Sequence, residues 1–133
     1  MVVKRVAQTG EAITIPAFGT DLETAGLTIP AADTVVASVT DVYKGTPVLA
    51  HFSAWYKTGG ADSFTHKFFR DGVELDATDE YLASNPGGEY FPVHFHWVDP
   101  APPPGTHTYD VVVISSVGGI SDIETRRLTV QEV

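Results

Sequence analysis

The sequence predicts an all-β protein, an antiparallel β-sandwich of the jelly-roll type. Three observations carry this prediction. Apolar residues alternate with polar ones in most segments, which is the period of a strand with one buried face. β-branched and aromatic residues are frequent in these segments, and turn-rich breaks separate them. Only residues 77–84 offer a helical candidate, one turn long, and an immunoglobulin-like sandwich is the alternative that the pattern allows.

The first half of the chain contains three expected strands and a hairpin. Residues 11–18 ("EAITIPAF") form a short strand after a glycine, and residues 33–43 ("DTVVASVTDVY") alternate in period two. Residues 46–56 ("TPVLAHFSAWY") are long and apolar, as expected of a central strand. Residues 63–75 form a hairpin, because Asp71-Gly72 accepts the positive φ angles of a type I′ turn.

The second half supplies three more strands, at residues 89–99, 107–116 and 125–133, so that the total is about eight. The stretch "DPAPPPG" (99–105) separates the first two of them. Proline fixes φ and removes a hydrogen-bond donor, so this stretch is expected to be a stiff corner and not a flexible linker.

The length of 133 residues suits one domain with its own apolar core. We expect residues 31–133 to form the sandwich. Residues 1–30 are expected to be either its first strands or an N-terminal arm that attaches the domain to a partner.

Composition excludes several classes of function. The formal net charge of −9 argues against nucleic acid as a partner, because phosphate binding needs clustered Lys and Arg. The absence of cysteine excludes disulfides and thiolate metal sites. No apolar run approaches the ~20 residues of a membrane span, and the first residues lack the apolar core of a signal peptide. We therefore expect synthesis in a cytoplasm and no membrane partner.

The stretch "FPVHFHWVD" (91–99) is the strongest candidate for chemistry, because His-x-His on a strand can present two imidazoles to one metal ion. Alternation assigns the large apolar residues to one face of the strand and both histidines to the other. The apolar set, expected in the core, is Phe91, Val93, Phe95 and Trp97.

His94, His96 and the nearby Asp99 resemble the first metal-binding motif of the cupins, which implies a metal ion inside a β-barrel. Two departures weaken the match. Asp99 follows His96 sooner than the acid of that motif does, and His107 comes too early to supply the ligand of the second motif. We therefore expect no metal, no cofactor and no catalytic residue, and we interpret His94 and His96 as surface or interface residues. His51 and His66 are expected to be structural histidines.

Four motifs follow one another along the chain, and their order is more specific than any one of them. They are "PVLAHFSAWY" (47–56), "HKFFRDGVEL" (66–75), "PVHFHWVDPAPPPGTHTYDVVV" (92–113) and "RRLTVQEV" (126–133). Over about residues 33–133 this order resembles small β domains of tailed-phage structural proteins, such as fibre knobs, head or neck fibres and capsid decoration proteins. The resemblance implies a jelly roll similar to the trimeric tumour-necrosis-factor and C1q heads. It also implies a virion location after assembly in the host cytoplasm.

We therefore predict a non-enzymatic structural virion protein, either a capsid decoration protein or a head or tail fibre component. It is expected to form a homotrimer and to contact the major capsid protein or a tail or neck protein. One alternative is a host-glycan-binding adhesion domain, with Trp55, Tyr56 or Trp97 stacked on sugars. The other is a cupin-like metal-dependent enzyme using His94 and His96. If these histidines face another copy of the chain, protonation below about pH 6.5 is expected to loosen the assembly.

Overall fold

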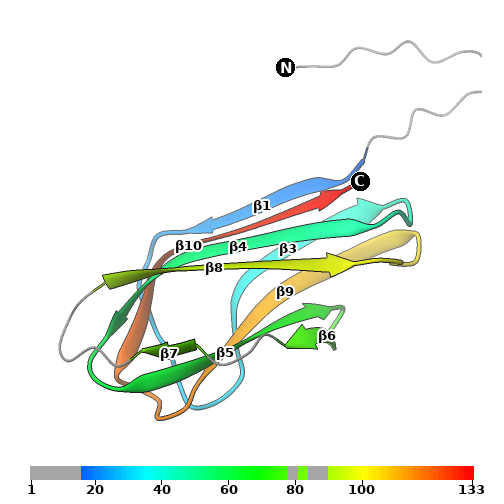
Figure 1. Cartoon of the computed structure of the whole chain (residues 1–133). Helices are drawn as coiled ribbons and strands as arrows, with labels where there is room; N and C mark the ends of the chain where they lie inside the picture. The colour runs from blue at the N-terminus through cyan, green and yellow to red at the C-terminus, as the bar shows by residue number, and fades with distance from the viewer. Residues whose placement is uncertain (1–15, 78–80, 84–89) are drawn as a thin grey trace, which may run out of the picture.

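Two antiparallel sheets face each other across one apolar core (Figure 1). The computed structural model describes residues 16–77, 81–83 and 90–133, and within these ranges it contains strands and no helix. No segment of the described chain is therefore a helix long and apolar enough to cross a membrane. The strands are β1 (Phe18–Glu23), β2 (Leu27–Thr28), β3 (Thr34–Tyr43), β4 (Val48–Thr58), β5 (Asp62–Arg70), β6 (Val73–Ala77), β7 (Tyr81–Ala83), β8 (Tyr90–Asp99), β9 (Gly105–Ser115) and β10 (Ser121–Glu132).

The strand order is that of a jelly roll. Sheet I has the order β1-β10-β4-β8, with β2 beside β10, and sheet II has the order β3-β9-β5-β6, with β7 beside β5. The chain thus folds as one long hairpin that pairs β1 with β10, β3 with β9 and β4 with β8, and then rolls so that β10 meets β4 and β9 meets β5. This confirms the predicted fold class. The immunoglobulin-like alternative does not fit, because that fold pairs its first strand with its second.

Aromatic side chains fill much of the space between the sheets. Phe68 lies at the centre of a stack, with Trp97 from sheet I on one side and Tyr109 from β9 on the other, each at a ring-centroid distance of 5.3 Å. All three are buried, at 0–3% exposed. The stack joins both sheets, and burial of each large ring contributes about 1.5–3 kcal/mol of transfer free energy.

The turns follow the predictions from residue type. Asp71 (φ 50°) and Gly72 (φ 79°) both have positive φ and close the β5–β6 hairpin, where Arg70 pairs with Val73. The proline-rich corner lies between the end of β8 at Asp99 and the start of β9 at Gly105, as expected.

The start and the middle of the chain differ from the predictions. The strand expected at 11–18 falls mostly on residues outside the described ranges, and β1 runs instead over Phe18–Glu23. The helical turn considered at 77–84 is wrong where the chain is described, because Ala77 ends β6 and Tyr81–Ala83 forms β7. Residues 16–30 contribute β1 and β2 to sheet I, and Ile29 is 1% exposed.

Candidate functional site

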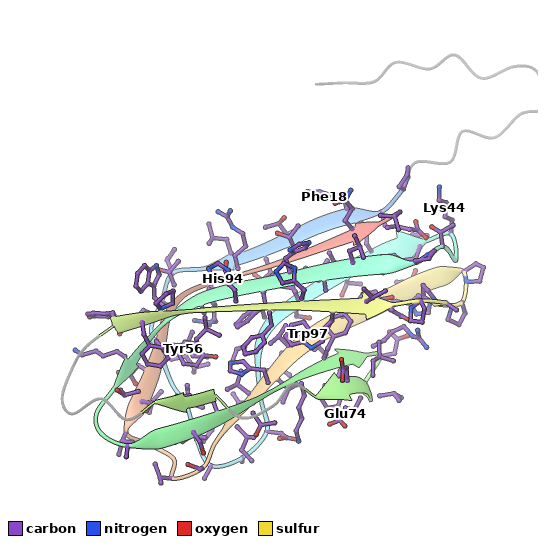
Figure 2. All side chains as sticks on the ribbon, viewed as in Figure 1. Phe18, Lys44, Tyr56, Glu74, His94 and Trp97 are labelled. Atoms are coloured by element: carbon purple, nitrogen blue, oxygen red, sulfur yellow. The ribbon has the colours of Figure 1, made fainter. Side chains whose placement is uncertain are left out.

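β8 is an edge strand of sheet I and carries the His-x-His stretch. Val93 and Trp97 are buried, and Phe91 and Phe95 pack half-buried against the core. His94 and His96 are exposed on the opposite face of the strand. In Figure 2, Trp97 lies between the two sheets while His94 points away from them. The predicted division of this strand into a core face and an outer face is confirmed.

The residues grouped by the cupin resemblance do not come together. His94 and His96 lie on the outer face of sheet I, whereas Asp99 is buried on its inner side and accepts a hydrogen bond from the Tyr109 hydroxyl at 2.8 Å. His107 lies in β9 of the other sheet. Within the described ranges no group of three or more His, Asp or Glu side chains is arranged to hold a metal ion.

His94 and His96 have neighbours that the sequence did not reveal. β4 pairs with β8 so that His51 lies opposite His96 and Ser53 lies opposite His94. The rings of His51 and His96 are 4.4 Å apart between centroids and inclined at 72°, an edge-to-face contact. Three exposed histidines from two strands therefore share one patch of the outer face.

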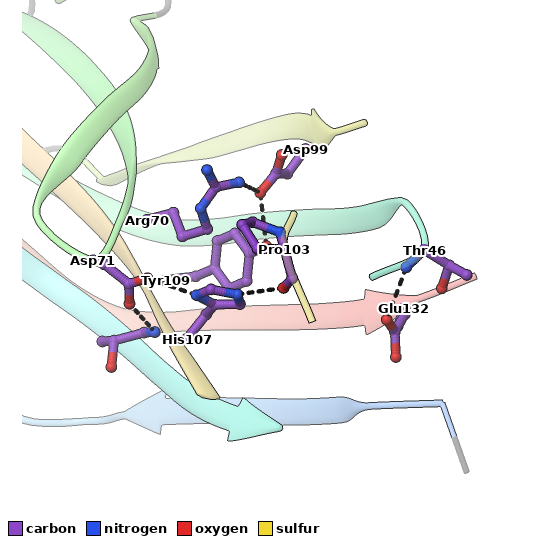
Figure 3. Close-up of polar contacts among 9 residues, drawn as sticks. Thr46, Arg70, Asp71, Asp99, Pro103, His107, Tyr109 and Glu132 are labelled. Atoms are coloured by element: carbon purple, nitrogen blue, oxygen red, sulfur yellow. Dashed lines mark hydrogen bonds and ion pairs between the residues drawn. The ribbon is translucent and has the colours of Figure 1, made fainter. Parts of the chain in front are cut away.

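His107 is a structural residue at the β5–β6 turn. Its Nδ1 lies 2.6 Å from Asp71 Oδ2 and its Nε2 lies 2.6 Å from the Pro103 carbonyl oxygen, while Asp71 Oδ1 accepts the Thr108 N–H at 2.8 Å (Figure 3). Both ring nitrogens face acceptors, so the bonds to Asp71 and Pro103 raise the pKa of His107. The Thr108 N–H, followed by His107, lowers the pKa of Asp71. This network fastens the hairpin turn to the proline-rich corner.

His66 is also structural, as expected. It is fully buried on β5, and its Nε2 shares a 2.5 Å hydrogen bond with the Tyr56 hydroxyl. Burial lowers the pKa of His66 to about 3, so the ring is neutral at physiological pH. Its ring also lies 4.2 Å from that of Phe95 and fills the space behind the His-x-His strand.

Two buried carboxylates that the sequence analysis overlooked hold strand ends together. Asp62, at the start of β5, accepts hydrogen bonds from the hydroxyls of Ser115 at 2.8 Å and Ser121 at 2.7 Å. Glu132, at the end of β10, accepts backbone N–H groups from both the β3–β4 turn and Ala17. Alternation contains a signal for Glu132, because it shares the core face of β10 with Leu128 and Val130.

Arg70 and Asp99 form the remaining inner cluster. They make an ion pair, and the same Asp99 oxygen accepts the Tyr109 hydroxyl (Figure 3). Burial, followed by the bond to Asp99, raises the pKa of Tyr109, so the hydroxyl keeps its proton and acts as a donor. The inner titratable groups thus serve contacts between strands.

The outer face of sheet I is different, because none of the described residues in the paired rows across its centre carries a carboxylate. Paired residues on this face form three rows that run across β1, β10, β4 and β8, and a shorter fourth row that crosses β4 and β8. The rows are Phe18–Gln131–Leu49–Val98, Thr20–Thr129–His51–His96, Leu22–Arg127–Ser53–His94 and Trp55–Pro92. None of these residues is acidic, although the chain has 17 Asp and Glu residues. Sheet II by contrast presents Lys67 paired with Asp33 at 3.0 Å and with Glu74 at 3.9 Å.

Two adjoining hollows mark the surface of sheet I between Trp55 and His51. The first, about 210 Å³, is bounded by Leu22, Trp55 and Pro92, and the second, about 180 Å³, by His51, His96 and Thr129. Ser53, His94 and Arg127 line both hollows, and we call this surface the Trp55 trough. Among the aromatic residues considered for sugar stacking, Trp55 is 50% exposed, whereas Tyr56 and Trp97 belong to the core.

Comparisons with known proteins give structural likeness only. No protein-family model and no curated protein sequence matches the chain. A chain of the T13 particle of infectious bursal disease virus is similar, with a TM-score of 0.58 at 13% identity over 88% of this chain. A chain from the Gx strain of that virus gives a TM-score of 0.53 at 16% identity over 90%. This chain spans about a third of their length, 31% and 33%.

A third similar structure, tailspike protein 4 of bacteriophage CBA120, has a TM-score of 0.35 at 18% identity, covering 88% of this chain and 18% of its own. That value is too low to support any inference. The two chains from infectious bursal disease virus support the two-sheet fold.

Proposed function

We propose that this chain is a non-enzymatic structural component of a tailed-phage virion, a capsid decoration protein or part of a head or tail fibre. The observation that carries the proposal is the jelly-roll strand order, which places the chain in the same architecture as chains of an icosahedral virus particle. The order of motifs over residues 33–133 supports the narrower assignment to phages.

The use of polar residues inside the roll supports a structural role. Buried Asp62, Asp99 and Glu132 accept hydrogen bonds from other strands or turns, and buried His66 is hydrogen-bonded to Tyr56. General acid–base catalysis needs a titratable group within reach of a substrate atom. Here these groups fasten strands to one another.

The outer face of sheet I supports assembly with other subunits. Phe18 (62% exposed) and Val98 (56% exposed) lie at the two ends of one row of this face, with Gln131 and Leu49 between them. Burial of these side chains against another protein would remove apolar surface from water. We propose that they contact another copy in a homotrimer or a neighbouring virion protein.

Mass in solution and in particles tests this proposal. Light scattering should give three times the chain mass of 14.3 kDa, and proteomics of purified virions should detect the chain in stoichiometric amount. Phe18→Ser combined with Val98→Ser should disrupt the assembly, while Val42→Ser, equally exposed on sheet II, should leave it intact. A strictly monomeric chain that is absent from virions would refute the proposal.

The same measurement tests the histidine hypothesis. If His94 and His96 lie in the interface, His94→Ser combined with His96→Ser should lower the mass. An unchanged mass for this variant removes the two histidines from the interface while leaving the structural role intact.

Host-glycan binding is a second candidate, and Trp55 favours it. A half-exposed indole beside a hollow is a surface on which a sugar ring can stack. A glycan array read with labelled protein separates the candidates, since reproducible signals support adhesion and silence supports decoration alone.

A further inference from the structure

The Trp55 trough combines shape, charge and an aromatic wall in one place. Its rows run from Thr129–His51–His96 through Arg127–Ser53–His94 to Trp55–Pro92. Each row is two residues from the next, so the trough is roughly 13 Å long. Its two hollows are smaller than the ~300–1,000 Å³ pockets that enclose drug-sized ligands. A narrow ligand lying along the surface fits this shape better than a bulky one.

Arg127 supplies the charge. Its neighbour Arg126 is buried and donates hydrogen bonds to the carbonyl oxygens of Val36 at 2.5 Å and Ala25 at 2.8 Å. Arg127 points to the opposite side of β10, is exposed, and lies within salt-bridge distance of no carboxylate in the described part of the chain. An unpaired guanidinium presents a planar set of donors that suits a carboxylate.

Trp55 supplies the apolar wall. The indole is half exposed on β4, directly opposite Pro92 on β8, and Leu22 closes the other side of the same hollow. Ser53 and His94 lie one row away and offer hydroxyl and imidazole groups at the floor. A flat apolar wall with nearby hydrogen-bonding groups matches a sugar ring, which has an apolar C–H face and a rim of hydroxyls.

We propose that the Trp55 trough binds an acidic saccharide. A uronic-acid ring packs on Trp55, Arg127 binds its carboxylate, and Ser53 and His94 bind hydroxyl groups. The absence of Asp and Glu from these rows lessens the repulsion that a chain of net charge −9 presents to an anion. The inference rests on the glycan-binding candidate, and it requires that the trough stays free of the subunit contact proposed for the neighbouring Phe18–Val98 row.

A glycan array and a titration test the inference. The array holds matched acidic and neutral oligosaccharides, among them tetragalacturonate and its methyl ester, which has the same rings without the charge. Binding is expected to be confined to acidic members and to weaken as NaCl rises. In the titration, acidic ligand should shield Trp55 from acrylamide, while Trp97, 3% exposed, serves as an internal reference.

Variants assign the contacts. Arg127→Gln should weaken binding of the acidic glycan at least about tenfold, since hydrogen bonds to charged groups are worth about 1.5–3 kcal/mol. Trp55→Ala should abolish binding. Lys44→Gln removes one exposed cation on the β3–β4 turn and should bind as the parent does. All three side chains are exposed, so the thermal unfolding temperature of each variant should stay close to that of the parent.

The outcomes separate the two levels of the hypothesis. Equal binding of the acid and the ester, unaffected by Arg127→Gln, overturns the role of charge while glycan binding stands. A silent array overturns glycan binding and this inference together, and the virion role is then judged by particle composition alone.

Discussion

Replacing Glu132 with Gln should destabilise the jelly roll by about 2–4 kcal/mol, because one buried carboxylate holds three parts of the chain. Glu132 is 2% exposed at the end of β10. Its Oε2 accepts the backbone N–H groups of Lys44 at 2.8 Å, Gly45 at 3.1 Å and Thr46 at 3.2 Å. Its Oε1 accepts the N–H of Ala17 at 3.2 Å. Figure 3 shows the side chain with Thr46.

The size of the effect follows from which hydrogen bonds of Glu132 the Gln side chain can still accept. Its carbonyl oxygen can take the place of Oε2 and retain three bonds, but these fall from the ~1.5–3 kcal/mol of a charged acceptor toward the ~0.5–1.5 kcal/mol of a neutral one. Its NH₂ group then faces the Ala17 N–H, which places a donor against a buried donor and costs about 1–3 kcal/mol. Contributions at one site are not additive, so the estimate lies below their sum.

The pH dependence gives a second signature. Burial, the largest influence, raises the pKa of Glu132, but the N–H groups of Ala17, Lys44 and Thr46 outweigh it and the pKa lies below its ordinary value of 4.5. The folded state therefore binds this proton less readily than the unfolded state. The stabilisation is complete above pH 4.5 and is lost as the pH falls through the lower folded value. The difference between the parent and Glu132→Gln should shrink in that range.

Urea unfolding followed by tryptophan fluorescence measures both effects, at pH 7 and at pH 3.5. Glu74→Gln is the matched control, because Glu74 lies on the surface, with 48% of its side chain exposed, and should lose less than about 0.5 kcal/mol. A loss below about 0.5 kcal/mol for Glu132→Gln at pH 7, or a difference that grows on acidification, would refute this reasoning.

Three further predictions concern the core and the turns. Trp97→Ala should cost about 3–5 kcal/mol in urea, because the ring is 3% exposed and stacked, and a loss under about 1 kcal/mol contradicts its place in the core. Gly118→Ala should destabilise the protein more than Gly72→Ala does. Both glycines have positive φ, but of the two only Gly118 would bring a Cβ within 2.7 Å of a backbone nitrogen, that of Ala31. Equal losses of stability in the two variants would exclude this clash. Asp71→Asn should lower the pKa of His107, as measured by NMR, and an unchanged pKa would exclude the pair. The protonated His107 ring gives its full stabilisation below pH 6.5, so the variant should lose more stability at pH 6 than at a pH above the raised pKa of His107.

The faces of the strands could be predicted from the sequence because they depend on local periodicity alone. In β8, alternation separated Val93 and Trp97 from His94 and His96, and no knowledge of the partner strand was needed. The Asp71-Gly72 turn was equally local, because its positive φ angles follow from residue type.

Features that depend on contacts between distant segments could not be predicted in this way. β1 contains Gly19 and Asp21, which weaken a strand pattern. In the fold a Cβ on Gly19 would overlap the Val39 side chain, and Asp21 Oδ2 accepts the Ser38 N–H at 2.9 Å. Both residues are therefore required by contacts with β3, on the opposite sheet. The pairing of His51 with His96 likewise depends on the register between β4 and β8, which local sequence patterns do not determine.

The chemistry of the His-x-His stretch is decided by its neighbours in the sheet. Alternation alone is compatible with a metal site, an interface or a ligand site, since each needs His94 and His96 to point outward. The register then places Ser53, Thr129 and Arg127 around them and no carboxylate in the rows it sets. A metal cation at this surface would meet the positive charge of Arg127 with no acidic ligand to offset it, whereas an anionic group would meet complementary charge. The surroundings of the two histidines therefore favour an acidic partner over a metal ion.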